Sequence, residues 1–151
     1  METSTGDREG SIVRRAEYSG ITRENLDQAA GRFTGSISQV PPRFAALKFK
    51  GRPYYQWARL GIEIPRIARE VRIHSFQVLS FDAPFWEARV VCSRGTYIRT
   101  LVEDVAKELG SAAVLDFLLR ERIGEYGCQN AIEWESLGRL TRDELIRYLH
   151  A

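Results

Sequence analysis

The chain has 151 residues, of which 44% are hydrophobic and 28% charged, and its formal net charge is +2. This length favours a single domain with a substantial core, and the composition is ordinary for a soluble globular protein. No apolar run approaches the roughly 20 residues of a membrane span, the polar start METSTGDREG does not resemble a signal peptide, and the two cysteines lack CxxC spacing. We therefore expect a cytoplasmic protein with reduced thiols and no membrane partner.

The segment ITRENLDQAAGRFTG, residues 21–35, is predicted to form the first helix. Thr22 suits the N-cap position and Gly35 suits the end. The apolar residues between them recur at helical spacing, which indicates one buried face. These residues are Leu26, Ala29, Ala30 and Phe33.

An extended segment and a second helix are predicted next. Pro41 and Pro42 exclude helix and favour an extended backbone. Gly51 marks a turn, and Pro53 suits the first position of a helix. On this helix Tyr54, Trp57 and Ala58 share one face.

Two strands and further helices are predicted in the second half of the chain. The segments REVRIHSFQVLSF and PFWEARVVCS are rich in β-branched and aromatic residues, and the second alternates apolar and charged positions. Helical spacing then runs from Ile98 to Leu109 with a stop at Gly110, and Ser111 is predicted to cap another helix over SAAVLDFLLRERIG. The tail TRDELIRYLH opens with a capping box from Thr141 to Glu144. Strands and helices that do not strictly alternate predict an α+β fold with a mixed or antiparallel sheet flanked by helices.

Positive charge is concentrated between residues 43 and 72. This window holds eight basic and two acidic residues, whereas the rest of the chain holds 14 basic and 18 acidic residues. Such a local excess is expected where a protein contacts phosphates, although a solvated face is an equally good interpretation of charge alone. The basic residues are Arg43, Lys48, Lys50, Arg52, Arg59, Arg66, Arg69 and Arg72.

The segment Gly95-Thr96-Tyr97-Ile98-Arg99 places an aromatic ring and a guanidinium two residues apart. In an extended chain Tyr97 and Arg99 would project from one face, where the ring could stack on a flat ligand and the cation could pair with an anion. The alternative is a core tyrosine beside a surface ion pair. If both are surface-facing site residues, they should tolerate Tyr97→Phe and Arg99→Lys with little change in stability.

Four stretches in one order resemble the TruB-type tRNA pseudouridine synthases and the related dyskerin branch. They are TSTGDREGSIV, TGSISQVPPRFAALKFKGRPYYQWARLGIEIPRIAREVRI, CSRGTYIRTLVEDVAKELG and LLRERIGEY. The resemblance covers about residues 3–137, and several independent motifs in order are far more specific than a single short pattern.

The resemblance implies roles for particular residues. The tyrosine matching Tyr97 packs against a flipped uracil and is the favoured proton acceptor, the arginine matching Arg99 pairs with the catalytic aspartate, and the leucine matching Leu118 lines the base pocket. The segment matching Gln39 to Arg59, within a thumb of about residues 36–60, closes on an RNA stem-loop. The RNA-binding residues expected from it are Gln39, Arg43, Lys48, Lys50, Arg52 and Arg59. No metal or organic cofactor is implied.

The nucleophile of the family lies in a G-T-L-D-P-like loop, and none of the six aspartates here has that context. We therefore expect residues 1–137 to be the C-terminal portion of an incomplete pseudouridine synthase catalytic domain. Residues 138–151 should add a C-terminal helix without a PUA domain. In the absence of the family's aspartate, Arg99 is expected to carry an unpaired charge, and Asp104 is the first candidate for an unorthodox nucleophile.

The implied activity is conversion of uridine-55 in the T-arm of tRNA to pseudouridine. The chain would supply the base-stacking, ion-pairing and RNA-clamping parts and would be inactive alone, with a separate polypeptide carrying the aspartate. Two alternatives are a module that binds tRNA stem-loops without modifying them, and a fragment whose unpaired sheet edge drives self-association.

Overall fold

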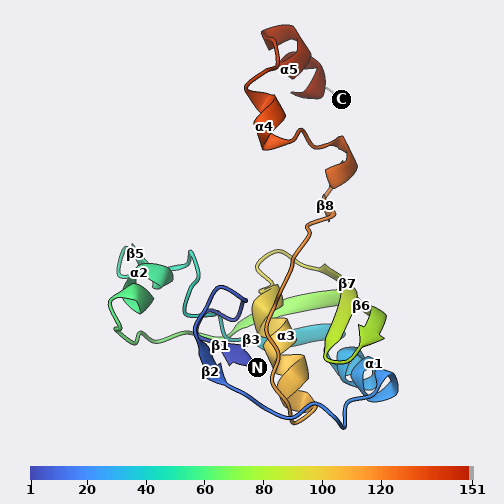
Figure 1. Cartoon of the computed structure of the whole chain (residues 1–151). Helices are drawn as coiled ribbons and strands as arrows, with labels where there is room; N and C mark the ends of the chain where they lie inside the picture. The colour runs from blue at the N-terminus through green and yellow to red at the C-terminus, as the bar shows by residue number, and fades with distance from the viewer. Residues whose placement is uncertain (150–151) are drawn as a thin grey trace. The chain divides into compact units, whose positions relative to one another are not determined.

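The computed structural model describes residues 1–149 and divides into two compact units, Met1–Asp116 and Phe117–Ala151 (Figure 1). The first unit contains β1 (Glu2–Thr3), β2 (Ile12–Arg14), α1 (Arg23–Arg32), β3 (Gly35–Gln39), β4 (Lys48–Phe49), β5 (Arg52–Pro53), α2 (Tyr54–Arg59), β6 (Arg69–Asp82), β7 (Phe85–Cys92) and α3 (Ile98–Glu108). The second contains β8 (Arg122–Ile123), β9 (Tyr126–Gly127), the 3₁₀ helix η1 (Cys128–Asn130), α4 (Trp134–Leu137) and α5 (Arg142–Leu149). The predicted α+β class is confirmed.

The largest sheet of the first unit has the order β3-β6-β7, and both pairings are antiparallel. The two predicted strands are the long partners β6 and β7, which pair with Gln77 opposite Arg89 and Phe81 opposite Trp86. Along β7 half-buried and exposed residues alternate, as the sequence pattern predicts. One face of the sheet is thereby available for packing against helices.

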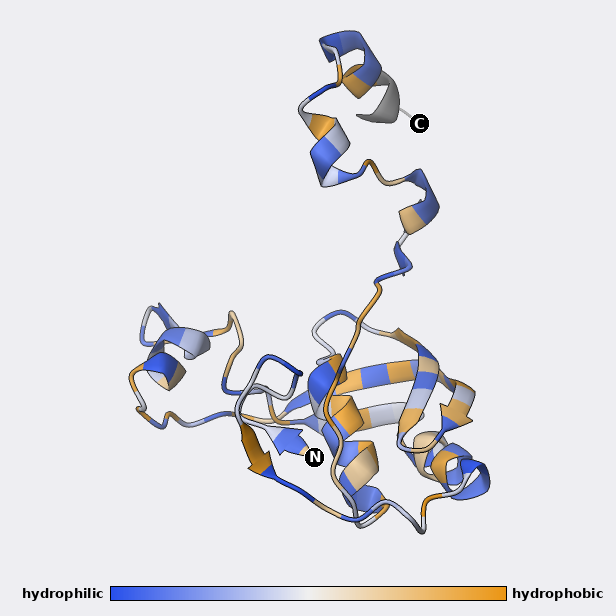
Figure 2. Cartoon of the chain, viewed as in Figure 1, coloured by the Kyte–Doolittle hydropathy of each residue, from blue (hydrophilic) through white to orange (hydrophobic). Residues whose placement is uncertain are grey.

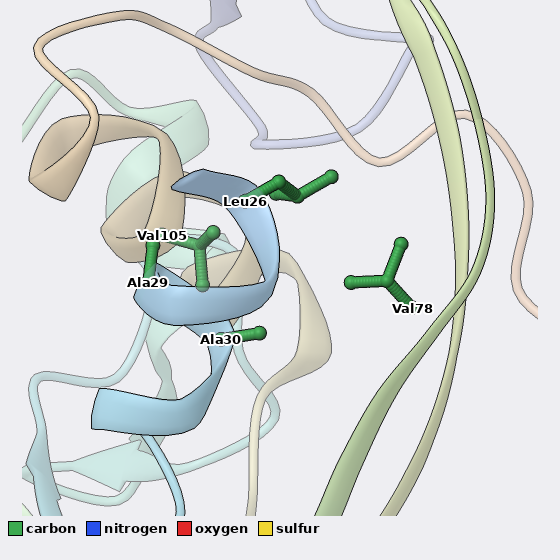
Figure 3. Close-up of a cluster of buried hydrophobic side chains, with 5 residues drawn as sticks. All are labelled: Leu26, Ala29, Ala30, Val78 and Val105. Carbon is green, nitrogen blue, oxygen red and sulfur yellow. The ribbon is translucent and has the colours of Figure 1, made fainter. Parts of the chain in front are cut away.

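The core of the first unit forms where α1 and α3 meet β6. Leu26, Ala29 and Ala30 of α1 cluster with Val78 of β6 and Val105 of α3, and each is at most 3% exposed (Figure 3). Both helices carry apolar as well as hydrophilic residues (Figure 2), as expected of a helix with one buried side. The core therefore holds α3, and with it the segment that precedes α3, at a fixed place beside the sheet.

The boundaries of α1 follow from its caps. The side chain of Thr22 accepts a hydrogen bond from the backbone N–H of Asn25 at 3.3 Å, and the side chain of Asn25 accepts one from the N–H of Thr22 at 2.9 Å. This reciprocal pair forms a capping box with asparagine at its third position. The predicted N-cap is confirmed, and Gly35 follows the helix with a φ of 100°.

The helix predicted over residues 111–124 is wrong. Ser111 caps no helix, because its hydroxyl donates to the carbonyl of Glu17 at 2.6 Å. Leu115 donates its N–H to Gly6 and accepts from Arg8, which forms an isolated parallel bridge between Leu115 and Asp7. These distant partners satisfy the backbone groups that a helix would have paired locally, so tertiary contacts outweigh helix propensity here.

The last predicted helix is present as α5, in the second unit. The side chain of Glu144 accepts from the backbone N–H of Thr141 at 2.8 Å, and the Thr141 hydroxyl accepts from the N–H of Glu144 at 3.4 Å. The predicted capping box is therefore confirmed, while His150 lies outside the described residues. Within residues 1–149 no helix combines the length and the apolar character that a membrane span needs, and no three potential metal ligands gather.

Candidate functional site

Tyr97 ends the turn between β7 and α3, and Arg99 lies two residues further on. β7 ends at Cys92, Gly95 has a φ of 84°, and the hydroxyl of Thr96 donates to the carbonyl of Ser93 at 2.9 Å. Tyr97 is the N-cap of α3 and Arg99 lies in its first turn. The expectation that these two residues alternate along an extended strand is therefore wrong, since helical backbone begins at Ile98. Gly95 supplies the left-handed conformation that allows the chain to reverse here.

Arg99 joins three segments of the chain. Its Nη1 donates to the backbone carbonyl of Thr5 at 3.1 Å and to Oδ2 of Asp7 at 2.8 Å, and its Nη2 donates to the carbonyl of Phe44 at 3.0 Å. The expectation that Arg99 carries an unpaired charge is wrong, because the T-x-T-x-D segment between β1 and β2 supplies a carboxylate. The planar guanidinium fork suits this task, because it can donate in several directions at once.

Asp7 is held in its ionised form. The hydroxyl of Thr5 donates to Oδ1 at 2.6 Å, and the backbone N–H of Glu9 donates to the same oxygen at 3.3 Å. The Thr5 hydrogen bond is the largest cause that lowers the pKa of Asp7, and the hydrogen bond and charge of Arg99 lower it further against the opposing effect of burial. The site therefore contains a fixed ion pair whose side chains are 25% and 29% exposed.

Gln39 was expected to contact RNA, but it is only 2% exposed. Its Oε1 accepts from the backbone N–H of Tyr97 at 3.0 Å, and its Nε2 donates to the carbonyl of Tyr97 at 3.3 Å. The amide of Gln39 is therefore occupied with the backbone of the N-cap of α3 and is not presented to a ligand. Tyr97 itself is half-buried, and this burial raises the pKa of its hydroxyl.

The basic part of the predicted thumb is a hairpin followed by a short helix. β4 and β5 pair through Lys50 and Gly51, whose φ values of 49° and 78° suit a two-residue hairpin turn. The next element is α2, with Pro53 as its N-cap in place of the predicted first helical position. All five expected basic contacts in this region, Arg43, Lys48, Lys50, Arg52 and Arg59, are exposed.

Aromatic rings support the cations of this hairpin and helix. The Arg52 guanidinium lies 4.8 Å from the centroid of the Trp57 ring, and the Arg59 guanidinium lies 5.4 Å from that of Tyr55. Trp57 is itself anchored by a hydrogen bond from its indole N–H to the carbonyl of Phe49 at 3.2 Å. Cation–π contacts of this kind hold the charges in place while leaving them at the surface.

Leu118 belongs to the second unit, where it is 53% exposed, and its assignment to the base pocket stays a prediction. Sequence reasoning missed all three partners of Arg99 described above, which are Thr5, Asp7 and Phe44. Asp7 was visible in the T-x-T-x-D stretch but was not linked to Arg99, 92 positions away. Phe44 contributes only a backbone carbonyl, and no side-chain pattern could have indicated it.

The comparison of this chain with known families gives its class. A family model described as "TruB family pseudouridylate synthase (N terminal domain)" matches residues 1–98, which is more than half of the chain. The chain therefore belongs to the TruB family of pseudouridylate synthases, and the resemblance noted in its motifs is confirmed.

Particular relatives are similar over most of this chain. It is 44% identical over 135 residues to the tRNA pseudouridine synthase B of Azoarcus sp., covering 89% of this chain and 45% of that protein. It is 44% identical over 149 residues to the protein of the same name from Chromobacterium violaceum, covering 95% of this chain and 48% of the relative. The chain thus spans about half the length of these curated relatives.

A solved structure shares the fold. The chain superposes with a TM-score of 0.62 and 25% identity on a chain in the crystal structure of a Cbf5-Nop10-Gar1 complex, covering 79% of this chain and 31% of that one. This similarity agrees with the α+β arrangement of helices and antiparallel strands described above.

Arg99→Ala should destabilise the protein far more than Tyr97→Phe. Removing the guanidinium leaves the carboxylate of Asp7 and two backbone carbonyls without their hydrogen-bond donor. We therefore expect the free energy of unfolding to fall by about 2–3 kcal/mol. Arg99→Lys should also be destabilising, contrary to the sequence-based expectation, because one ammonium cannot reproduce the fork. Tyr97→Phe should cost less than about 1 kcal/mol, since no described residue hydrogen-bonds to its hydroxyl.

Urea denaturation followed by circular dichroism measures these differences. Arg94→Ala is the matched control, because Arg94 is an exposed arginine in the same turn and should stay within about 0.5 kcal/mol of the wild type. Equal stability of Arg99→Ala and Arg94→Ala would contradict the assigned role of the Arg99 contacts.

Proposed function

We propose that this chain is the base-stacking and RNA-clamping part of a tRNA pseudouridine synthase that modifies uridine-55 in the T-arm. The observation that carries the proposal is the joining of three family motifs at Arg99 and Tyr97. The T-x-T-x-D segment contributes Asp7, the thumb segment contributes Gln39 and Phe44, and the start of α3 contributes the two central residues. The naming of the relatives as tRNA pseudouridine synthases supports the substrate class.

The proposed reaction is an isomerisation of one nucleotide. The uridine is flipped out of the stack, its C1′–N1 bond breaks, the base rotates, and a C1′–C5 bond forms while C5 loses a proton and N1 gains one. Extrusion of the base costs a few kcal/mol, which contacts to the RNA must offset. The exposed cations of the hairpin and α2 are suited to this, because they can pair with phosphates on either side of the flipped base.

Tyr97 is proposed to stack on the flipped uracil. Burial raises the pKa of its hydroxyl, so the hydroxyl is protonated at neutral pH and the ring offers a flat, neutral surface to the base. Arg99 is proposed to orient the carboxylate that attacks the ribose. Because Asp7 already occupies Nη1, the incoming aspartate would have to share or displace this contact.

The nucleophilic aspartate is proposed to come from outside this sequence. The chain contains no G-T-L-D-P stretch, and a stacking or ion-pairing group cannot replace a nucleophile. We therefore place that segment on a separate polypeptide or on a part of the protein not represented in this sequence. The cytoplasm, where such a tRNA substrate is found, stays the predicted location.

Binding to a T-arm hairpin tests the RNA specificity. The purified chain should bind a hairpin with the T-arm stem and loop about tenfold more tightly than a hairpin with the same stem and an unrelated loop. Filter binding at two salt concentrations measures the ratio. Equal affinity for both hairpins would contradict T-arm recognition, and no binding at low salt would contradict RNA clamping altogether.

A second candidate function is T-arm binding without modification. It is favoured by the exposed cations of the hairpin and α2 together with the absence of a G-T-L-D-P stretch from the sequence. The complementation experiment described in the Discussion separates the two.

A further inference from the structure

We propose that Gln39 is a positioning residue that couples the thumb to Tyr97, an inference that rests on the proposed function. Gln39 is the last residue of β3 and the first residue of the Gln39–Arg59 segment expected to form the thumb. Its side chain is among the most fully buried in the described chain, yet it is polar. A buried amide of this kind is stable only when its donor and acceptor are both used.

The pairing of Gln39 with Tyr97 has a specific geometry. The amide oxygen accepts from the N–H of Tyr97 at 3.0 Å, and the amide nitrogen donates to the carbonyl of Tyr97 at 3.3 Å. That carbonyl also accepts the N–H of Leu101 at 3.0 Å, which is the first hydrogen bond of α3. Gln39 therefore fixes both the backbone of the stacking residue and the start of the helix that carries Arg99.

The first part of the thumb, residues 39–44, is held by two further hydrogen bonds. The Pro41 carbonyl accepts from Nη1 of Arg66 at 3.0 Å, and the Phe44 carbonyl accepts from Arg99 at 3.0 Å. In the same segment, Pro41 and Pro42 restrict the backbone to extended conformations. A displacement of the thumb on RNA would therefore be transmitted through a stiff segment to the Gln39 amide, and from there to the ring that faces the base.

Amide exchange of the full chain tests the positioning role. Gln39→Met keeps the length of the side chain but removes both hydrogen bonds, so the amide of Tyr97 should exchange about tenfold faster or more. Gln39→Glu retains the acceptor and should be affected less. Gln28→Met is the matched control, because Gln28 is an exposed residue of α1, and it should leave the amide of Tyr97 unchanged.

A double-mutant cycle in tRNA binding distinguishes positioning from general packing. Gln39→Met should weaken binding about tenfold when Tyr97 is present but less than about twofold in a Tyr97→Ala background, because its effect acts through that ring. The same factor in both backgrounds, or wild-type exchange at Tyr97 in Gln39→Met, would overturn the proposal. If Gln39→Met fails to fold, Gln39→Leu, which also lacks both hydrogen-bonding groups, carries both measurements. If the wild-type chain binds no tRNA, the proposed function is refuted. The amide exchange of Tyr97 would still show whether Gln39 holds the backbone of Tyr97.

Discussion

The purified chain alone is expected to release no tritium from tRNA labelled at C5 of uridine. Release requires cleavage of the C1′–N1 bond, and no aspartate of this sequence lies in a G-T-L-D-P context. Adding a polypeptide that carries this segment, taken from one of the relatives, should restore release from an undetectable level to a measurable rate. The chain spans about half the length of those relatives, so the added polypeptide would be a part of the relative that this chain does not match.

Two variants serve as controls for this complementation. The aspartate of the added G-T-L-D-P segment changed to asparagine should abolish release, because an amide is not a nucleophile. Arg99→Ala in this chain should also abolish it, provided that circular dichroism shows the variant to be folded under the assay conditions. Restored activity with either variant would contradict the assigned roles.

Turnover by the chain alone would contradict the proposal and would point to another nucleophile. Asp7 would then be the first candidate, because its carboxylate lies 2.8 Å from the Arg99 guanidinium. The sequence had favoured Asp104, but the structure places that carboxylate 3.7 Å from Lys107 on α3, and burial raises its pKa.

The second large effect is expected in the salt dependence of tRNA binding. Changing Lys48, Lys50 and Arg52 together to alanine removes three exposed cations from one hairpin. Each phosphate contact releases counterions, so the slope of log affinity against log salt should become shallower by about 2–3. At low salt the affinity should fall by about tenfold or more, which filter binding across a salt series measures.

A matched triple variant isolates position from total charge. Arg15, Arg139 and Arg142 are exposed cations outside the thumb, and changing all three to alanine alters the net charge by the same amount. This control should change the slope by much less. An unchanged slope in the hairpin variant, or an equal change in both variants, would show that the hairpin is not the RNA contact.

Local sequence patterns predicted the helices and strands that local interactions determine. The cap at Thr22, the spacing along α3 and the alternation along β7 were all visible, because each depends on neighbours within a few residues. The failed helix after Ser111 shows the limit of such patterns. Its backbone groups are paired with Gly6 and Arg8, roughly 100 residues earlier, which no local pattern records.

The sequence indicated individual candidate residues of the site but not the contacts between them. Motif resemblance identified Tyr97 and Arg99, but the partner of Arg99 and the burial of Gln39 depend on how distant segments pack. The resemblance of the segment from Gln39 to Arg59 to an RNA-clamping thumb implied that Gln39 contacts RNA. The structure instead uses its amide to satisfy a helix N-cap, because the ends of helices leave backbone groups that need partners.

The contacts that join Arg99 to Asp7 also bear on how the protein folds. They close a loop of 92 residues, whereas the pairing of β6 with β7 requires only a short connection. Closing long loops costs more entropy, so contacts of this kind are expected to form late. We expect the hairpin of β6 and β7 to assemble before the site, and an intact ion pair at Arg99 would then report that the N-terminal segment has docked. A nascent or partly folded chain would accordingly carry the hairpin of β6 and β7 before the contacts of Arg99 have formed.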